Sequence, residues 1–271
     1  MKRKVDSYDE KEPVITVEEE IENIVDWIKH YFIRNGADSK AIIGISGGKD
    51  STIAAALCIE ALGKDRVVGV LMPQGIQADI EDARKVCKEL DIKSYEINID
   101  DACAALYQSL DKGLYENEND SVVLNKAIYT NLPARIRMTT LYAIAAKEGG
   151  RVCNTCNRSE NYIGYSTKYG DHAGDFSPLG HYTVRELLAI GDALALPYDL
   201  VHKTPADGMC GSSDEANLGF TYEALDAYLL ENKNPDYETL KLIEQAHARN
   251  MHKLINIPTC QPLNRHARYA F

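Results

Sequence analysis

The chain has no hydrophobic run long enough to cross a bilayer, which takes about 20 consecutive apolar residues. Residues 1–13 are charged and lack the apolar segment of a secretory signal peptide. Together these absences exclude the usual marks of a membrane or secreted protein. We therefore expect a cytoplasmic protein without a membrane partner.

An excess of positive charge is also missing. The chain has 41 acidic and 30 basic side chains, for a formal net charge of −11. Proteins that bind nucleic acid usually carry the opposite balance, so we expect no nucleic-acid partner, although a local basic patch is compatible with this total. A net charge this far from zero also favours solubility.

The cysteines do not form a disulfide framework. There are seven of them, an odd number at irregular spacings, so we expect mostly reduced thiols, several of them buried. Internal repeats and linkers are absent too. With 271 residues and 45% hydrophobic residues, the chain can build one large core. We expect a single domain over residues 1–271, with residues 1–15 as a flexible N-terminal tail.

Short apolar segments alternate with helical patterns along the first half of the chain. This alternation predicts an α/β fold, with a Rossmann-like parallel sheet that carries helices on both faces. The predicted strands are residues 41–45, 66–72 and 93–99, with a fourth that opens at 152–153. The predicted helices are residues 16–36, 52–62, 79–90, 100–110, 121–147 with a break near Pro133, 183–194, 221–230 and 237–249.

Three stretches have no such pattern and are predicted to be loops. Residues 116–120 are acidic and polar, residues 164–180 are rich in glycine, and residues 204–219 are typical of a lid. Ligands of parallel sheets bind at the carboxyl ends of the strands. Residues 72–74 and 98–100, which follow two predicted strands, are therefore candidate walls of an adenosine pocket.

The most specific feature is the run Gly44-Ile45-Ser46-Gly47-Gly48-Lys49-Asp50-Ser51-Thr52, between a predicted strand and a predicted helix. Successive backbone N–H groups in such a turn form an anion-sized concavity, and the helix N-terminus adds partial positive charge. The paired glycines have no Cβ, so a phosphate can approach the backbone closely. The hydroxyls and the lysine can add further donors. The pattern predicts a phosphate-binding loop.

Asp50 is the unusual member of this loop, because a carboxylate repels a phosphate unless a divalent cation lies between them. We therefore interpret Asp50 as a ligand of Mg²⁺, which favours carboxylate and phosphate oxygens. The loop is not the G-x-x-x-x-G-K-[ST] loop of many nucleotide-binding proteins, because Lys49 is followed by Asp50. Its S-G-G-x-D-S pattern resembles the pyrophosphate loop of ATP-dependent adenylating enzymes.

Three further stretches extend this resemblance, together with the late pair His252-Lys253. They are Pro133-Ala134-Arg135-Ile136-Arg137-Met138, Asn157-Arg158-Ser159-Glu160 and Thr167-Lys168-Tyr169-Gly170-Asp171. In this order and spacing they resemble the ammonia-dependent NAD⁺ synthetases, and the resemblance runs from about Thr16 to about Lys253. It implies a ligase that adenylates the carboxylate of deamido-NAD⁺ with ATP and then displaces AMP with ammonia. It also implies Mg²⁺ as cofactor and a homodimer.

The resemblance assigns roles to individual positions. Those matched to ATP binding are Gly44, Ile45, Ser46, Gly47, Gly48, Lys49, Asp50, Ser51 and Thr155. Those matched to deamido-NAD⁺ binding are Arg135, Lys168, Asp175, His252 and Lys253. Asp50 and Glu160 match metal ligands. Asp171 matches the acid that takes a proton from ammonium, and with Lys49 and Ser46 it makes up the predicted catalytic set.

Two positions depart from the family pattern. Val184 stands where many relatives carry a lysine, and Ala206 follows a proline where they carry serine or threonine; both positions contact ATP in the family. Arg185, Lys203 and Thr204 are candidate replacements. An amidase domain, which would need roughly 100–200 further residues, is absent. We therefore expect free ammonia, or ammonia from a separate partner chain, as the donor.

Enzymes with a different chemistry share part of this pattern. Enzymes that thiolate transfer RNA carry the same loop and often use paired cysteines, and Cys153 and Cys156 form a C-x-x-C. A second C-x-x-C is absent, so a four-thiolate metal site is incomplete. We interpret Cys153 as part of the strand core and Cys156 as incidental. The loop is also compatible with another amidating ligase of the superfamily and with a non-enzymatic ATP sensor.

Overall fold

The computed structural model describes residues 15–77, 79–118, 126–203 and 214–260. Most of the predicted N-terminal tail, residues 1–14, lies outside the described residues. So do the greater part of the predicted lid, with Thr204 and Ala206, and the last eleven positions, 261–271. In the part of the chain that is described, no helix combines the length and the apolar character that a membrane span requires.

The centre of the fold is a four-stranded parallel sheet, as predicted. Its strands are β1 (Lys40–Gly44), β2 (Val67–Leu71), β3 (Lys93–Glu96) and β4 (Gly150–Val152), in the order β3-β2-β1-β4. The third strand ends earlier than the predicted residue 99. Two amides beyond it still bond toward the sheet, because Ile97 N donates to Leu71 O at 2.8 Å and Ile99 N to Pro73 O at 2.9 Å.

Helices cover both faces of the sheet, because successive strand side chains point to opposite sides. Ala41 and Ile43 belong to one core, and Ile42, between them, belongs to the other. The first core is closed by α1 (Val17–Asn35), α2 (Lys49–Leu62), α3 (Ile80–Glu89) and α7 (Val184–Ala193). The second is closed by α4 (Asp100–Glu118) and α5 (Lys126–Glu148).

The local signals of α1 act as the sequence predicts. Thr16 and Glu19 form a capping box, in which each side chain accepts a hydrogen bond from the other residue's backbone N–H. Ile24, Val25, Ile28 and Phe32, on one face of the helix, are then buried in the first core, and Gly36, with a φ of +137°, ends the helix. This helix therefore forms where its sequence predicts it.

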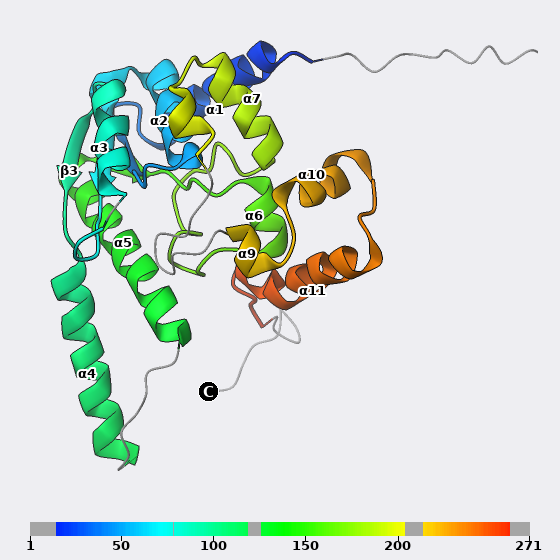
Figure 1. Cartoon of the computed structure of the whole chain (residues 1–271). Helices are drawn as coiled ribbons and strands as arrows, with labels where there is room; N and C mark the ends of the chain where they lie inside the picture. The colour runs from blue at the N-terminus through cyan, green and yellow to red at the C-terminus, as the bar shows by residue number, and fades with distance from the viewer. Residues whose placement is uncertain (1–14, 78, 119–125, 204–213, 261–271) are drawn as a thin grey trace, which may run out of the picture.

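The C-terminal half adds a third, smaller core beside the sheet (Figure 1). It is built from α6 (Arg158–Ile163), α9 (Asp214–Leu218), α10 (Tyr222–Glu231) and α11 (Tyr237–Leu254), and α8 (Tyr198–Val201) packs on α2. The 3₁₀ turn η1 (Lys64–Arg66) precedes β2. The close packing of α6 against α11 brings the end of α11 beside the loop that follows α6.

Three predicted features are wrong. Helix α5 continues through Pro133 instead of breaking there, because its later turns, with Met138 and Leu141, are buried on the sheet. In the helical turn before Pro133, side chains donate hydrogen bonds to backbone carbonyl groups; Asn131 Nδ2, for example, donates to Ala127 O at 2.8 Å. Residues 116–118 belong to α4 rather than to a loop, and residues 214–218 form α9. Helix α6 is missed because six residues are too few to show a period.

Candidate functional site

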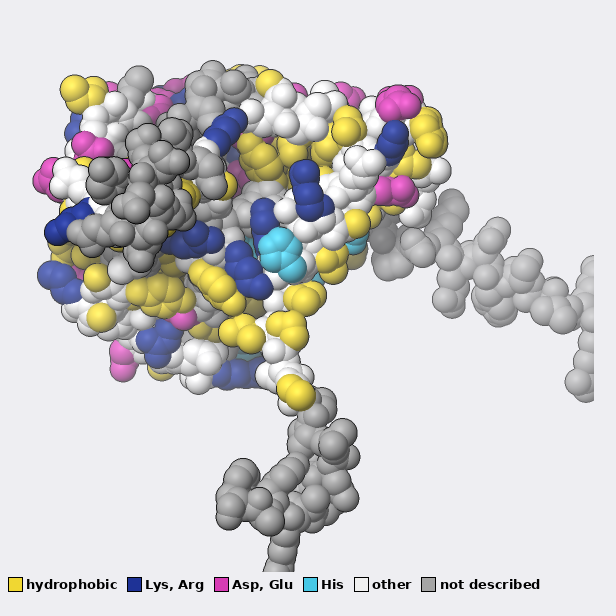
Figure 2. Space-filling model, turned by 90° about the horizontal axis from the view of Figure 1, so that it is seen from below, with side chains coloured by type: hydrophobic (Ala, Val, Ile, Leu, Met, Phe, Trp, Pro, Cys, Tyr) yellow, Lys and Arg dark blue, Asp and Glu magenta, His cyan; other side chains and the backbone are white. Residues whose placement is uncertain are grey.

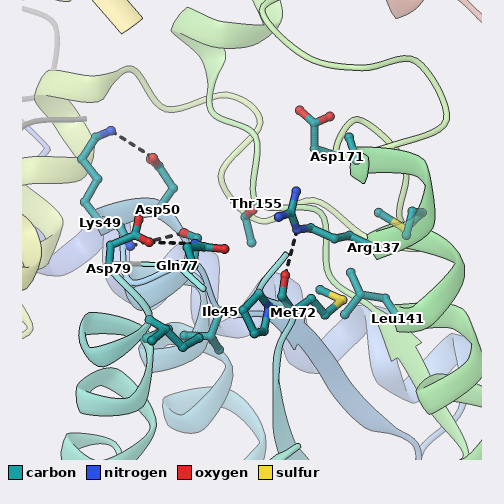
Figure 3. Close-up of a pocket in the computed structure, with 18 of the residues that line it drawn as sticks. Ile45, Lys49, Asp50, Met72, Gln77, Asp79, Arg137, Leu141, Thr155 and Asp171 are labelled. Atoms are coloured by element: carbon teal, nitrogen blue, oxygen red, sulfur yellow. Dashed lines mark hydrogen bonds and ion pairs between the residues drawn. The ribbon is translucent and has the colours of Figure 1, made fainter. Parts of the chain in front are cut away.

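A cavity of about 390 Å³ opens at the carboxyl edge of the sheet, between β1 and β4. The chain leaves β1 through α2 on one face and returns to β4 from α5 on the other, so this is the switch point at which open α/β sheets bind ligands. Figure 3 shows side chains that line it. The predicted site residues in the lining are Gly44, Ile45, Ser46, Gly48, Lys49, Asp50, Thr155, Glu160 and Asp171.

The phosphate loop is held in shape by its own hydroxyl groups. Ser51 Oγ donates to Gly48 O at 3.1 Å and Thr52 Oγ1 donates to the same carbonyl at 2.8 Å. Both side chains are buried. Ser46 Oγ accepts from Gly48 N at 3.2 Å. The hydroxyls of Ser51 and Thr52 are therefore used inside the loop, whereas Ser46 lines the cavity.

The two glycines of the loop have different surroundings. Gly47 has a φ of +81°, and a Cβ there would lie 2.7 Å from Ala83 N and 2.8 Å from Asp82 Cβ, both on α3. Gly48 caps α2 with a φ of −92°, and the nearest atom to a Cβ there would be Ser46 Oγ at 3.4 Å. Only Gly48 lines the cavity. The position of Gly47 requires a residue without a Cβ because α3 packs directly on it. At Gly48 the missing side chain leaves space in the cavity wall.

Lys49 and Asp50 form an ion pair at the start of α2, with 2.9 Å between Nζ and Oδ2. The lysine is almost fully buried. Burial by itself lowers the pKa of its ammonium, but the nearby carboxylates of Asp50 and Glu160 outweigh this effect and raise the pKa. Lys49 therefore remains a full positive charge in the floor of the cavity.

Asn157 brings the two predicted metal ligands together. Its Nδ2 donates to Asp50 Oδ1 at 3.3 Å, and its backbone N donates to Glu160 Oε2 at 3.0 Å within the capping box of α6. Burial, and then the negative charge of Asp50, raise the pKa of the Glu160 carboxyl to about 8. A buried carboxyl group whose ionisation is opposed by a neighbouring carboxylate in this way suits a cation between the two.

The donor set fits magnesium better than a metal held by protein alone. Among the residues that the structure describes, no group of three or more His, Cys, Asp or Glu side chains could hold an ion. Mg²⁺ usually takes one or two carboxylates and completes its shell with water and substrate phosphates. Asp50 and Glu160 beside a phosphate loop offer such a set.

Asp171 lines the cavity from the loop at residues 164–180. Its Oδ1 accepts from Thr167 N at 2.9 Å, and its backbone carbonyl accepts from Asn154 Nδ2 at 2.8 Å. Surrounding protein raises the pKa of this carboxyl through desolvation. The loop thus holds a carboxylate of increased basicity against the cavity.

Four of the five predicted dinucleotide-binding residues form a cluster outside the cavity lining. Arg135 Nε donates to Lys168 O at 3.2 Å, Lys168 Nζ to His252 O at 2.5 Å, and Lys253 Nζ to Gly164 O at 2.8 Å. Figure 2 shows Lys, Arg and His side chains gathered on the face viewed from below. This cluster joins α5, the loop at residues 164–180 and the end of α11.

Asp175 is apart from both groups. Its Oδ2 accepts from Val152 N at 2.7 Å and its Oδ1 from Tyr142 OH at 3.2 Å. It is neither in the cavity lining nor joined to the cluster by a hydrogen bond or ion pair of the described residues. The structure of one chain therefore does not bring it to the other predicted dinucleotide contacts.

Comparison with known proteins identifies the family. A family model described as NAD synthase matches residues 20–260. The chain belongs to the NAD synthase family. The NH(3)-dependent NAD(+) synthetase of Pyrococcus furiosus is 38% identical over 199 residues, which are 73% of this chain and 74% of that protein. The corresponding protein of Carboxydothermus hydrogenoformans is 34% identical over 238 residues, 87% of this chain and 94% of its own length.

Solved structures of NAD synthase relatives agree with the fold. NMN synthetase from Francisella tularensis superposes with a TM-score of 0.82 at 30% identity, and the match covers 91% of this chain and 99% of that one. NH3-dependent NAD synthetase from Campylobacter jejuni superposes with a TM-score of 0.70 at 27% identity, over 91% of this chain and 100% of that one. The predicted family resemblance and fold class are confirmed, and membership makes the chain an enzyme of the ligase class.

The departures from the NAD synthase pattern can now be placed. Val184 is buried at the start of α7, and the side chain of Arg185 turns away to pair with Glu231 at 2.8 Å. Lys203 lines the cavity and forms an ion pair with Asp82. Of the described candidate replacements, Lys203 is the one that the structure puts in the cavity wall.

The cysteines give no support to a thiol chemistry. Cys153 and Cys156 are buried, and burial raises the pKa of both thiols well above the ordinary value. A thiolate is the nucleophilic form, so both groups are inert at neutral pH. Cys153 is part of the core, as predicted. Cys156 has a local role, because its Sγ approaches Asp171 O at 3.4 Å.

Sequence reasoning missed several residues of the NAD synthase cavity. Its walls also include Gln77, Asp79, Arg137, Tyr165 and Asp214. Of the predicted adenosine walls, Met72 and Pro73 line the cavity, whereas residues 98–100 do not. The strand pattern predicted correctly that the cavity lies at the carboxyl edge of the sheet. Which strand ends line the cavity, however, depends on how α5 packs on the sheet.

Proposed function

We propose that this enzyme amidates deamido-NAD⁺ with ammonia and ATP, and so forms NAD⁺, AMP and pyrophosphate through an acyl-adenylate. The observation that carries the proposal is a single cavity that holds three elements together. These are a phosphate loop, a pair of carboxylates suited to Mg²⁺, and the separate carboxylate of Asp171. We also propose that residues 1–271 form one catalytic domain and that the enzyme acts in the cytoplasm.

In the first half-reaction, the acceptor carboxylate attacks the α-phosphorus of ATP, and the bond to the bridging oxygen breaks so that pyrophosphate leaves. Ser46, Gly48 and Lys49 line the cavity where the departing phosphates would bind. Asp50 and Glu160 would hold Mg²⁺, which supplies charge neutralisation on the phosphates. Thr155 lines the same cavity and would contact the nucleotide.

In the second half-reaction, ammonia attacks the acyl carbon and AMP leaves with the bonding electrons. Ammonium has no lone pair, so a base must first remove a proton. Asp171 fits this role because it faces the cavity, and desolvation raises its pKa and hence its basicity. Free ammonia is the proposed donor.

The cationic cluster of Arg135, Lys168, His252 and Lys253 supports binding of a substrate with several anionic groups. We propose that these residues and Asp175 bind deamido-NAD⁺. The separation of Asp175 from the cluster supports a homodimer, in which a second copy would supply the contacts that one chain lacks. A sedimentation or light-scattering measurement of molar mass tests this point.

A mononucleotide substrate is a second candidate. It is favoured by one observation: the TM-score is 0.82 with a solved NMN synthetase, against 0.70 and 0.71 with two solved NAD synthetases. Amide formation on nicotinic acid mononucleotide would use the same cavity chemistry. Only the part of the site that holds the adenosine half of the dinucleotide would differ.

One assay tests both candidates. The purified chain is incubated with ATP, Mg²⁺ and ammonium, together with either deamido-NAD⁺ or nicotinic acid mononucleotide, and kcat/KM is compared. With deamido-NAD⁺ we expect AMP, pyrophosphate and the amide product NAD⁺. We also expect kcat/KM to be larger for deamido-NAD⁺ than for nicotinic acid mononucleotide. A larger value for the mononucleotide would transfer the proposal to it, and release of ADP would contradict adenylation altogether.

A further inference from the structure

Arg137 differs from the other cations of the cavity wall. Among the lining residues that the structure describes, three are basic: Lys49, Arg137 and Lys203. Lys49 is paired with Asp50, and Lys203 is paired with Asp82. Arg137, by contrast, has no carboxylate within ion-pair distance in the described ranges.

Among the described residues, the guanidinium of Arg137 is anchored through its Nε alone. Its Nε donates to Met72 O, at the end of β2, with a distance of 3.0 Å. In Figure 3 the rest of the group points into the cavity, toward the region that Thr155 and Asp171 line. No described residue accepts a hydrogen bond from the two Nη groups, which form the planar fork that matches carboxylate and phosphate.

A cation without a matching anion is costly in such a position. Arg137 is partly buried, and desolvation lowers its pKa, although an arginine stays charged in proteins. Removing a cation from water without a matching anion stays unfavourable even after the protein has relaxed around it. A role in packing alone does not explain a guanidinium in this wall, whereas a bound anion would compensate the cost.

We propose that Arg137 is a catalytic residue that binds the junction between the acceptor carboxylate and the α-phosphate of ATP. The inference rests on the proposed function and deepens it. During adenylation a carboxylate oxygen bonds to the α-phosphorus while the bond to the pyrophosphate oxygen breaks. The Nη groups of Arg137 donate to non-bridging oxygens at that phosphorus, where negative charge develops, and then hold the acyl-adenylate for attack by ammonia.

The test compares Arg137→Gln and Arg137→Lys with wild type. Steady-state pyrophosphate release is measured with ATP, Mg²⁺, ammonium and deamido-NAD⁺, and thermal unfolding is followed for each protein. Removal of one preorganised donor in such a site costs about 10²–10³ in kcat. We therefore expect kcat of Arg137→Gln to fall about 100-fold or more with a much smaller change in KM for ATP, and Arg137→Lys to keep an intermediate rate.

Arg66→Gln is the matched control. Arg66 also donates to a backbone carbonyl, from Nε to Ser39 O at 3.1 Å and from Nη2 to the same atom at 2.6 Å, but it lies outside the cavity lining. This variant should lose stability and keep its kcat within about twofold. A loss of kcat in Arg137→Gln no larger than in Arg66→Gln overturns the inference.

Chemical rescue keeps the inference testable if a substitution weakens the fold. Added guanidinium ion at low millimolar concentration should restore part of the rate to Arg137→Ala and none to Arg66→Ala. Equal response of the two variants overturns the inference. Wild-type protein that forms no AMP overturns the proposed function itself, whereas active wild type with an active Arg137→Gln overturns the role of Arg137 alone.

Discussion

The paired glycines of the phosphate loop should fail in different ways when each is replaced by alanine. Gly47→Ala places a Cβ 2.7 Å from Ala83 N on a backbone with a φ of +81°. The left-handed conformation costs about 1–2 kcal/mol for an alanine. The contact with the α3 backbone adds about 1–3 kcal/mol of overpacking. We expect a total loss of about 2–5 kcal/mol in the free energy of unfolding.

Gly48→Ala meets neither obstacle, because its φ is −92° and the nearest atom to the new Cβ is Ser46 Oγ at 3.4 Å. Its stability should change by less than about 1 kcal/mol. The methyl group would narrow the cavity wall at the phosphate loop. We therefore expect a tenfold or greater rise in KM for ATP, which corresponds to about 1.4 kcal/mol.

Thermal unfolding and steady-state kinetics on the two variants separate these effects. A loss of about 2–5 kcal/mol lowers Tm by roughly 4–15 °C in a domain of this size. Gly47→Ala should show that shift, and Gly48→Ala should show the kinetic defect at nearly wild-type Tm. If Gly47→Ala unfolds at the wild-type temperature, or if Gly48→Ala binds ATP normally, the reasoning about this loop is wrong.

The remaining predictions concern carboxylates. Asp50→Asn and Glu160→Gln should each lower AMP formation more than 100-fold while the protein still folds, because each keeps a hydrogen-bond acceptor and loses the charge needed for Mg²⁺. Asp50→Asn should also lower Tm, because it leaves the buried Lys49 without its ion-pair partner. Normal turnover in both variants would remove the metal assignment. Asp171→Asn should still release a first equivalent of pyrophosphate at the wild-type rate and then form amide slowly, and an equally slowed first release of pyrophosphate would refute its role as base. Glu148 accepts hydrogen bonds from three lysines and a tyrosine hydroxyl, and these contacts hold the pKa of its carboxyl well below the ordinary 4.5. Its carboxylate should therefore stabilise the fold. Since that contribution is complete above pH 4.5 and lost as pH falls, Glu148→Gln should lower Tm at pH 7 and approach wild type in acid. A Tm difference that is independent of pH would contradict this.

The parallel sheet and the strand, turn and helix start around residues 44–52 could be predicted because their causes are local in the sequence. An apolar run followed by small residues and an alanine-rich helix specifies a strand, a turn and a helix start, whatever the rest of the chain does. The capping box of Thr16 and Glu19 is local in the same sense. Pro133 shows the limit of local rules, because tertiary burial of the later turns of α5 outweighs the helix-breaking preference of proline.

Side chains that act through long-range packing could not be singled out in this way. Arg135 and Arg137 stand in one motif, in which the family resemblance assigns a role to Arg135 alone and the residue types do not distinguish the two arginines. Two residues apart on a helix, they point to different sides. Arg135 joins the outer cluster through Lys168, and Arg137 reaches the end of β2 and the cavity. That distinction depends on how α5 lies on the sheet.

The adenylation step itself is tested most directly by an oxygen-label experiment. Deamido-NAD⁺ with ¹⁸O in its nicotinate carboxylate is turned over with ATP, Mg²⁺ and ammonium, and the nucleotide product is analysed by mass spectrometry. If the carboxylate attacks the α-phosphorus at the loop of Gly47 and Gly48, AMP must carry one ¹⁸O atom. AMP without the label, or ADP in its place, would contradict the account.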